Sequence, residues 1–150
     1  MLVKEEKMFI HIKDRFKCPC CGYPTLPDRR HYDICNLCDW EDDGQDDYNA
    51  YEIVSGGPNG EYTLREAREN FKKYYVMYPP EDCGSDQIGD EDEDINIKIE
   101  LMRLYTEAQV EENEESLLEI ESKIGILEEK QHTNLEDKIK EYEKNIKSNK

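Results

Sequence analysis

The sequence has no apolar run long enough to cross a membrane, and it does not open with a secretory signal. Its first residues, MLVKEEKMFIHIKDRFK, are charged throughout. We therefore expect a cytoplasmic protein with no membrane contact. In such a reducing compartment, closely spaced cysteines bind metal ions more often than they form structural disulfides.

Basic residues are few. The 150 residues include 20 Lys and Arg against 37 Asp and Glu, which gives a formal net charge of −17. Proteins that bind nucleic acids neutralise phosphates with Lys and Arg, so this balance argues against a nucleic-acid partner. An acidic surface favours a basic protein partner instead.

Histidine is also scarce, since only His11, His31 and His132 are present. They do not form a paired metal site, and we find no Ser–His–Asp set. The turn SGGPNG, residues 55–60, lacks the G-x4-G-K-[ST] spacing of a phosphate-binding loop. The sequence therefore shows no catalytic constellation, and we expect no enzymatic activity.

Cysteine and proline are absent from residues 84–150. The acidic segment after Pro79 and Pro80 contains glycine and resists packing, which is typical of a linker. These changes in composition predict a metal-binding domain over residues 1–80, an acidic linker over 81–94 and a tail over 95–150.

The tail has the apolar spacing of two or three amphipathic helices. The apolar residues are Ile97, Leu101, Leu104 and Ala108, then Leu117, Ile120, Ile124 and Leu127, then Leu135, Ile139, Tyr142 and Ile146. Each stripe must be buried, so the tail either forms a hairpin that packs on itself or a coiled-coil-like arm that binds a partner or a second copy.

Four cysteines form two C-x2-C pairs, Cys18 with Cys21 and Cys35 with Cys38, thirteen residues apart. Such a turn can direct two thiolates at one ion about 2.3 Å away, and two turns complete a tetrahedron. Pro19 presets the bend of the first turn. The pattern predicts one Zn²⁺ per chain in a closed site that stabilises the fold.

The other cysteines leave alternatives open. Cys20 lies between two expected ligands, where it either packs under Trp40 or is exposed, and Cys83 lies in the linker. A site in which His31 replaces one thiolate, or a redox site without metal, would use the same segment differently.

The acidic stretch WEDDGQDD follows the second pair. With Asp39 it nearly matches a calcium loop, but the twelfth position is Ala50 instead of a bidentate Glu. A metal-dependent hydrolase that uses these carboxylates is the alternative to a binding function, and it would need a second, open metal site. Trp40 is expected to pack over the zinc turns.

A helix is predicted after the SGGPNG turn, with Thr63 as its cap and Glu66 completing a capping box. Leu64, Ala67 and Phe71 form its apolar face, while Arg65, Arg68, Lys72 and Lys73 make the outer face basic. The fold class is therefore α+β: a small zinc-ribbon-like module with short strands and one helix, followed by the helical tail.

Three segments occur in order: CPCCGYPTL, YDICNLCDWEDDGQDD and GGPNGEYTLREARENF. Together they resemble the bacterial cysteine-rich CPCC family over roughly residues 18–71. The resemblance implies a small zinc-binding domain without established enzymatic activity. Asn36 stands where the family usually has proline and Asp39 where an aromatic is common, both at turn positions. The tail after Tyr78 lies outside the resemblance.

The acidic stretch and the helix could together form a surface for a protein partner, as in an acidic immunity or inhibitor protein that neutralises a basic toxin or nuclease. The predicted partner-binding residues are Trp40, Glu41, Asp42, Asp43, Asp46, Arg65, Arg68 and Asn70. The alternative is an intramolecular network in which Arg68 pairs with Asp42 or Asp43 and Asn70 caps the turn at 55–60.

Overall fold

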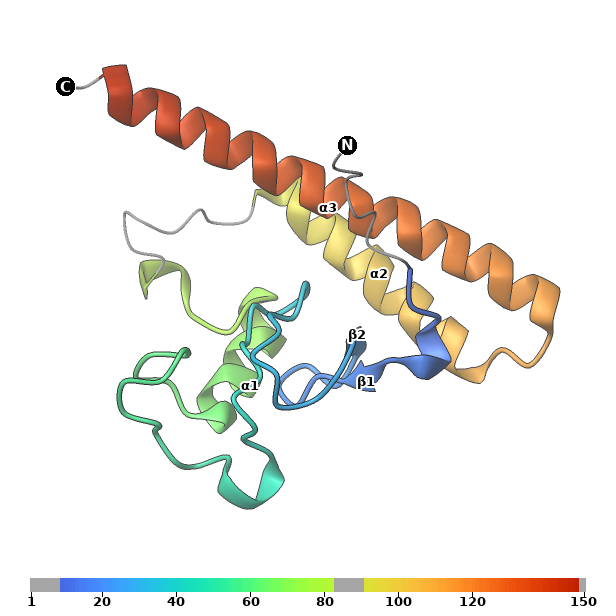
Figure 1. The fold of residues 1–150 in the computed structure, drawn as a ribbon, viewed down its shortest axis with the longest axis horizontal. Coiled ribbons are helices and arrows are strands. Elements are labelled where there is room, and N and C mark those ends of the chain that lie inside the picture. Colours follow the sequence, from blue (N-terminus) through green and yellow to red (C-terminus); the bar gives the residue numbers. More distant parts are fainter. Residues whose placement is uncertain (1–8, 83–90, 149–150) are drawn as a thin grey trace, which may run out of the picture.

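The computed structural model describes residues 9–82 and 91–148 (Figure 1). Two short strands and one helix form the amino-terminal module, and two longer helices form the tail. The elements are β1 (Phe16–Lys17), β2 (Pro24–Leu26), α1 (Leu64–Tyr74), α2 (Asp92–Val110) and α3 (Glu114–Ser148), with 3-10 turns at Ile12–Asp14, Asp47–Asn49 and Pro80–Asp82. This confirms the α+β class and the zinc-ribbon-like module with its helical tail.

The module presents its cysteines at the ends of two short antiparallel pairings. β1 and β2 pair with Phe16 opposite Leu26, and the first C-x2-C lies between them. An isolated bridge joins Ile34 to Glu41 and brackets the second C-x2-C in the same way. Each pair of cysteines is therefore positioned by the backbone on both of its sides.

Helix α1 begins where the sequence predicts. Thr63 is its N-cap and forms the capping box with Glu66, while Leu64, Ala67 and Phe71 are buried. Tyr75 terminates the helix in the left-handed region, with φ 61°, and its N–H donates to Phe71 O at 2.9 Å. The buried face packs α1 against the cysteine turns in one core.

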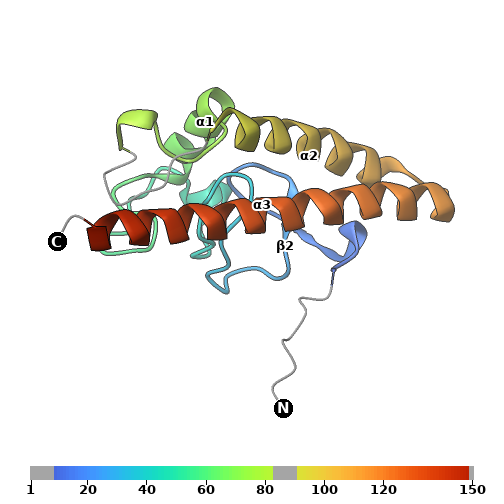
Figure 2. The same cartoon turned by 90° about the horizontal axis from the view of Figure 1, so that it is seen from above.

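The tail forms a helical hairpin that packs both on itself and on the module (Figures 1 and 2). The predicted face of α2 is confirmed, because Ile97, Leu101, Leu104 and Ala108 are buried together with Tyr105. The second and third predicted stretches are one helix, α3, of 35 residues. The third predicted stripe differs from the others, because its residues are 37–49% exposed: Leu135, Ile139, Tyr142 and Ile146. Ile124 of α3 and the buried face of α2 belong to the same core as the cysteines.

The boundary between module and tail differs slightly from the composition-based prediction. Helix α2 begins at Asp92, inside the segment predicted as linker, and Glu91 N donates to Asp94 Oδ2 at 2.7 Å. Most of that linker, residues 83–90, lies outside the described residues, and Cys83 with it. In the part of the chain that the structure describes, no helix has the length and apolar character of a membrane span.

Candidate metal centre

The two C-x2-C turns have the same backbone conformation. In the first, Gly22 N donates to Cys18 O at 2.8 Å and Cys18 N donates to Tyr23 O at 2.9 Å. In the second, Asp39 N donates to Cys35 O at 3.0 Å and Cys35 N donates to Trp40 O at 3.0 Å. The residue after each second cysteine is left-handed, with φ 80° at Gly22 and 67° at Asp39. Each C-x2-C turn and the two residues that follow it are called a knuckle here, and the two knuckles share one backbone conformation although their residues differ.

The knuckles bring four sulfurs together. The Sγ atoms of Cys18, Cys21, Cys35 and Cys38 all lie within 4.8 Å of one another. The Sγ atoms of Cys18 and Cys38 are 3.6 Å apart, as are those of Cys21 and Cys35. Four thiolates around a tetrahedral ion with bonds of about 2.3 Å would be about 3.8 Å apart. The cluster therefore fits a metal ion.

Burial and mutual hydrogen bonding shift the pKa of Cys38 in the same direction and that of Cys35 in opposite directions. Burial raises the pKa of Cys38, and hydrogen bonds with its neighbouring thiols raise it further. Burial also opposes ionisation of Cys35, but hydrogen bonds from Cys18, Cys21 and Cys38 together lower its pKa well below the ordinary value. Leu37 N also donates to Cys35 Sγ at 3.4 Å. A cation bound among the four sulfurs would offset the cost of ionising these buried thiols.

Comparison with known families agrees with this geometry. Residues 16–82 match the family model Cysteine-rich CPCC. The match confirms the resemblance suspected over residues 18–71 and extends it to the end of the module. No curated protein and no solved structure matches the chain. The CPCC segment and its four-cysteine cluster indicate a metal-binding module, and the tail lies outside the match.

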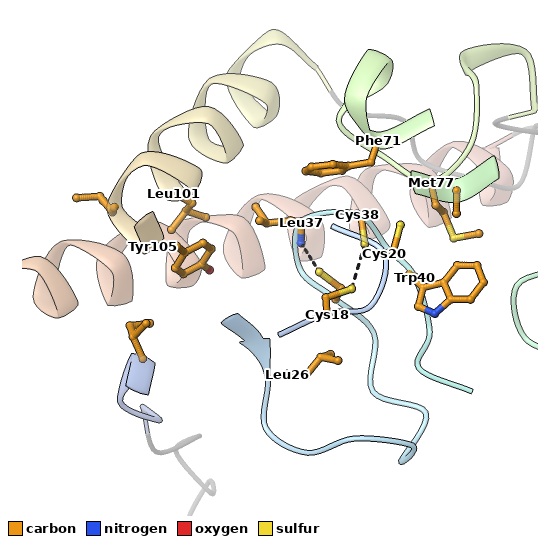
Figure 3. Packing of buried hydrophobic residues seen from close by; sticks show 14 of the residues in the cluster. Cys18, Cys20, Leu26, Leu37, Cys38, Trp40, Phe71, Met77, Leu101 and Tyr105 are labelled. Carbon is orange, nitrogen blue, oxygen red and sulfur yellow. Dashed lines mark hydrogen bonds between the residues drawn. The ribbon is translucent and has the colours of Figure 1, made fainter. Parts of the chain in front are cut away.

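The structure answers the question of the extra cysteine in the CPCC segment. Cys20 is buried, with 7% of its surface exposed, and it belongs to the core that contains Trp40 and Met77 (Figure 3). It therefore packs inside the module and is not an exposed thiol. His31 lies away from the cluster, because its side chain is 64% exposed and pairs with Asp28.

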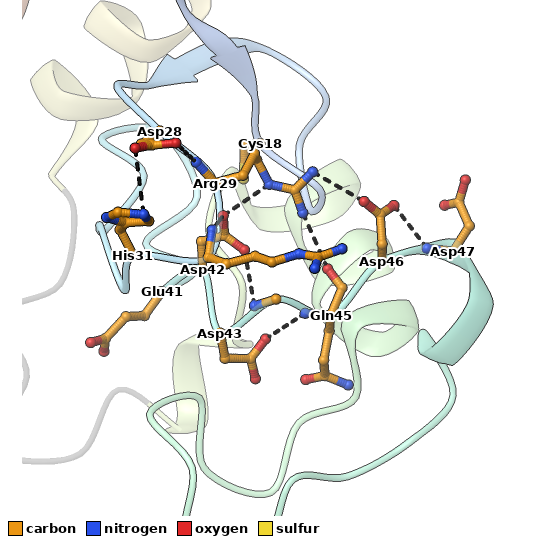
Figure 4. A network of polar contacts seen from close by, with 12 residues as sticks. Cys18, Asp28, Arg29, His31, Glu41, Asp42, Asp43, Gln45, Asp46 and Asp47 are labelled. Atoms are coloured by element: carbon orange, nitrogen blue, oxygen red, sulfur yellow. Dashed lines mark hydrogen bonds and ion pairs between the residues drawn. The ribbon is translucent and has the colours of Figure 1, made fainter.

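The acidic stretch of the CPCC segment is not a continuous exposed surface. Trp40 and Asp42, which were predicted to contact a partner, are fully buried, so neither side chain is part of the surface of the folded module. Trp40 packs beside the cysteines in the hydrophobic core. Asp42 instead pairs with Arg29 inside the module (Figure 4). Asp42 Oδ2 accepts from Arg29 Nε at 2.9 Å and from Arg30 N at 2.7 Å.

The other carboxylates of this stretch organise the loop. Asp46 accepts from Arg29 Nη1 at 3.1 Å, and Asp43 accepts from Gln45 N at 3.0 Å. The backbone of Glu41 is held by the side chain of Asn59, which accepts from Glu41 N at 2.9 Å and donates to Glu41 O at 2.8 Å. Within residues 9–82 and 91–148, the four cysteines are the one cluster that could hold a metal ion, so these carboxylates do not converge on a second site.

The predicted network around α1 exists but uses other partners. Arg68 Nε donates to Pro19 O at 2.8 Å, and its Nη2 pairs with Asp47, not with Asp42 or Asp43. Asn70 donates to Met77 O at 2.9 Å and so closes the end of α1, while Asn59 holds the turn that Asn70 was expected to cap. Arg65 is exposed beside Tyr62 in a shallow pocket of about 430 Å³.

Because the two knuckles share a left-handed residue, we expect loss of glycine at Gly22 to lower stability and introduction of glycine at Asp39 to be tolerated. Gly22→Ala should destabilise the module by about 1 kcal/mol, because a left-handed backbone is unfavourable for a residue with a Cβ and no neighbour lies within 4 Å of that position. Asp39→Gly should be more stable than Asp39→Ala by a similar amount. Thermal unfolding of the three variants measures both differences. Equal stability of the two Asp39 variants would show that this residue is not strained.

Proposed function

We propose that the protein is a non-catalytic zinc-binding module for protein interaction. Cys18, Cys21, Cys35 and Cys38 would bind one Zn²⁺, and the bound ion would stabilise the small folded module. The supporting observation is the closed arrangement of the four sulfurs, three of them in buried residues. A site with four protein thiolates leaves no coordination position for a substrate.

Zinc is the ion that this ligand set favours. Four soft thiolates in tetrahedral arrangement select zinc or iron over calcium and magnesium, and paired C-x2-C turns are typical of structural zinc. The proposal includes a reducing, cytoplasmic setting, in which these thiols stay available for the metal.

The proposed partner surface is the loop that precedes α1. Tyr48, Tyr51, Ile53 and Val54 are 70%, 61%, 51% and 42% exposed. Tyr48 lies in the 3-10 turn at Asp47–Asn49, and Tyr51 follows the residue that caps this turn, Ala50. In Figure 1 this loop lies at the end of the module that is far from α3.

The loop is held in place from inside. Gln45 is buried, and its Nε2 donates to Asn49 O at 3.3 Å and to Glu52 O at 3.0 Å. Exposed apolar and aromatic side chains on an ordered loop cost little entropy on binding. Exposed Asp47 and Glu52 alongside the tyrosines favour a partner that carries Lys or Arg, as a basic toxin or nuclease would for an acidic immunity or inhibitor protein.

Co-purification from the native host tests the partner surface. We expect a basic protein that is retained at low salt, released at high salt and lost with the double variant Tyr48→Ser, Tyr51→Ser. The control is Tyr32→Ser, which removes a 58% exposed tyrosine outside the loop. Retention of neutral or acidic proteins alone, equally in high salt, would contradict a basic partner.

A further inference from the structure

The second knuckle touches the tail at the residue that follows its first cysteine. Asn36 Nδ2 donates to Gln131 Oε1 of α3 at 3.0 Å and to Tyr105 OH of α2 at 3.1 Å. Gln131 Nε2 donates in return to the backbone oxygen of Asn36 at 3.1 Å. Asn36 and Gln131 therefore form a reciprocal pair between the CPCC segment and a helix outside it.

The backbone oxygen of Asn36 belongs to the same rigid peptide unit as Leu37 N, which donates to Cys35 Sγ at 3.4 Å. A planar peptide turns as one body, so fixing its oxygen also fixes the direction of its N–H. Gln131 thus sets the orientation of the hydrogen bond that a cysteine sulfur receives. Figure 3 shows Leu37 and the sulfurs with Tyr105 pointing toward them from α2.

The first knuckle is held at the equivalent atom from within the module. Pro19 occupies in that knuckle the position that Asn36 occupies in the second, and its oxygen accepts from Arg68 Nε at 2.8 Å. Both central peptides are thus fixed through their carbonyl oxygens. Helix α1 supplies the donor for one knuckle, and the tail supplies it for the other.

A buried polar cluster holds the tail at this place. Arg15 makes two hydrogen bonds to Glu128 of α3, at 2.7 and 2.9 Å, and its side chain is only 7% exposed. Tyr105 OH also donates to Glu128. Burial and the Glu128 carboxylate raise the pKa of Tyr105 well above its ordinary value, so the phenol stays protonated as a donor.

We propose that the helical tail controls metal retention, with Gln131 as the positioning residue that holds the second knuckle in its ligating conformation. A partner or condition that lifts α3 from the module would then speed release of the metal. The inference rests on the proposed zinc site. Wild-type protein that contained no metal would refute the zinc site itself. Wild-type protein that binds zinc but releases it at the same rate as the Gln131 variants would refute only the role of the tail.

Transfer of zinc from the full-length protein to an excess of a chromophoric chelator tests the proposal. Removal of an outer partner of a metal ligand typically weakens binding by 10- to 100-fold, so Gln131→Ala should release zinc about tenfold faster. Gln131→Glu should also release it faster, because it keeps the acceptor for Asn36 Nδ2 but loses the donor to Asn36 O. The matched control is Thr133→Ala, an exposed neutral position two residues further along α3.

A spectroscopic measurement separates positioning from loss of stability. With Co²⁺ in place of zinc, both Gln131 variants should shift the thiolate-to-metal absorption bands, since one sulfur changes its hydrogen bond. Release at the wild-type rate, or faster release with unchanged Co²⁺ bands, would overturn the proposal.

Discussion

Removal of zinc by a chelator is expected to unfold the amino-terminal module cooperatively. Structural zinc sites contribute about 10–16 kcal/mol of apparent binding free energy at neutral pH, which exceeds the total stability of most small domains. Here three of the four ligating cysteines are part of the core with Leu26, Leu37 and Trp40, and Cys21 packs against it. Without a cation, up to four thiolates within 4.8 Å of one another would repel or would have to take up protons.

Trp40 reports this transition, because it is the only tryptophan in the sequence and is fully buried beside the cysteines. Chelation should shift its fluorescence emission to longer wavelength, and added zinc should restore the emission. Part of the helical circular dichroism should persist, since α2 and α3 also pack on each other. Unchanged Trp40 emission after complete removal of the metal would contradict a structural role for zinc.

Arg29→Ala is expected to produce the second large effect, a loss of about 3–5 kcal/mol of stability. Its guanidinium pairs with Asp42, whose carboxylate is fully buried, and with Asp46. Burial opposes the charged form of Arg29, but the hydrogen bonds to Asp42 and Asp46 raise its pKa overall. Truncation would leave the Asp42 carboxylate with backbone donors alone among the residues that the structure describes, Arg30 N and Gly44 N.

The control for this effect is Arg30→Ala. It removes the same charge from the next residue, whose side chain is exposed and whose backbone N–H still donates to Asp42. Urea denaturation of both variants with zinc bound gives the comparison. Losses of equal size would show that the net charge of the acidic chain, and not the buried pair, accounts for the effect.

The parts of this structure that the sequence predicted depend on short spacings. Two C-x2-C pairs, the Thr63 capping box and the apolar face of α2 each depend on successive spacings of three or four residues. Chain geometry at that range is nearly independent of the rest of the fold. The sequence pattern alone therefore identified the candidate ligands and the helices α1 and α2.

The parts that the sequence did not predict depend on distant residues. Asn36 and Gln131 are 95 positions apart, and no sequence motif links the two. Burial of Asp42 within an acidic stretch likewise depends on Arg29 as its partner, which composition does not indicate. The left-handed Asp39 was detectable in principle, because it aligns with Gly22 when the two knuckles are compared residue by residue.

The central claim is that Cys18, Cys21, Cys35 and Cys38 bind one zinc ion and that Cys20 is buried but does not bind the metal. The most direct test is the metal content per chain, measured by elemental analysis of purified wild-type, Cys38→Ser and Cys20→Ser proteins. We expect one zinc per chain in the wild type and in Cys20→Ser, and loss of zinc in Cys38→Ser. A wild-type protein without zinc, or loss of zinc in Cys20→Ser, would contradict this claim.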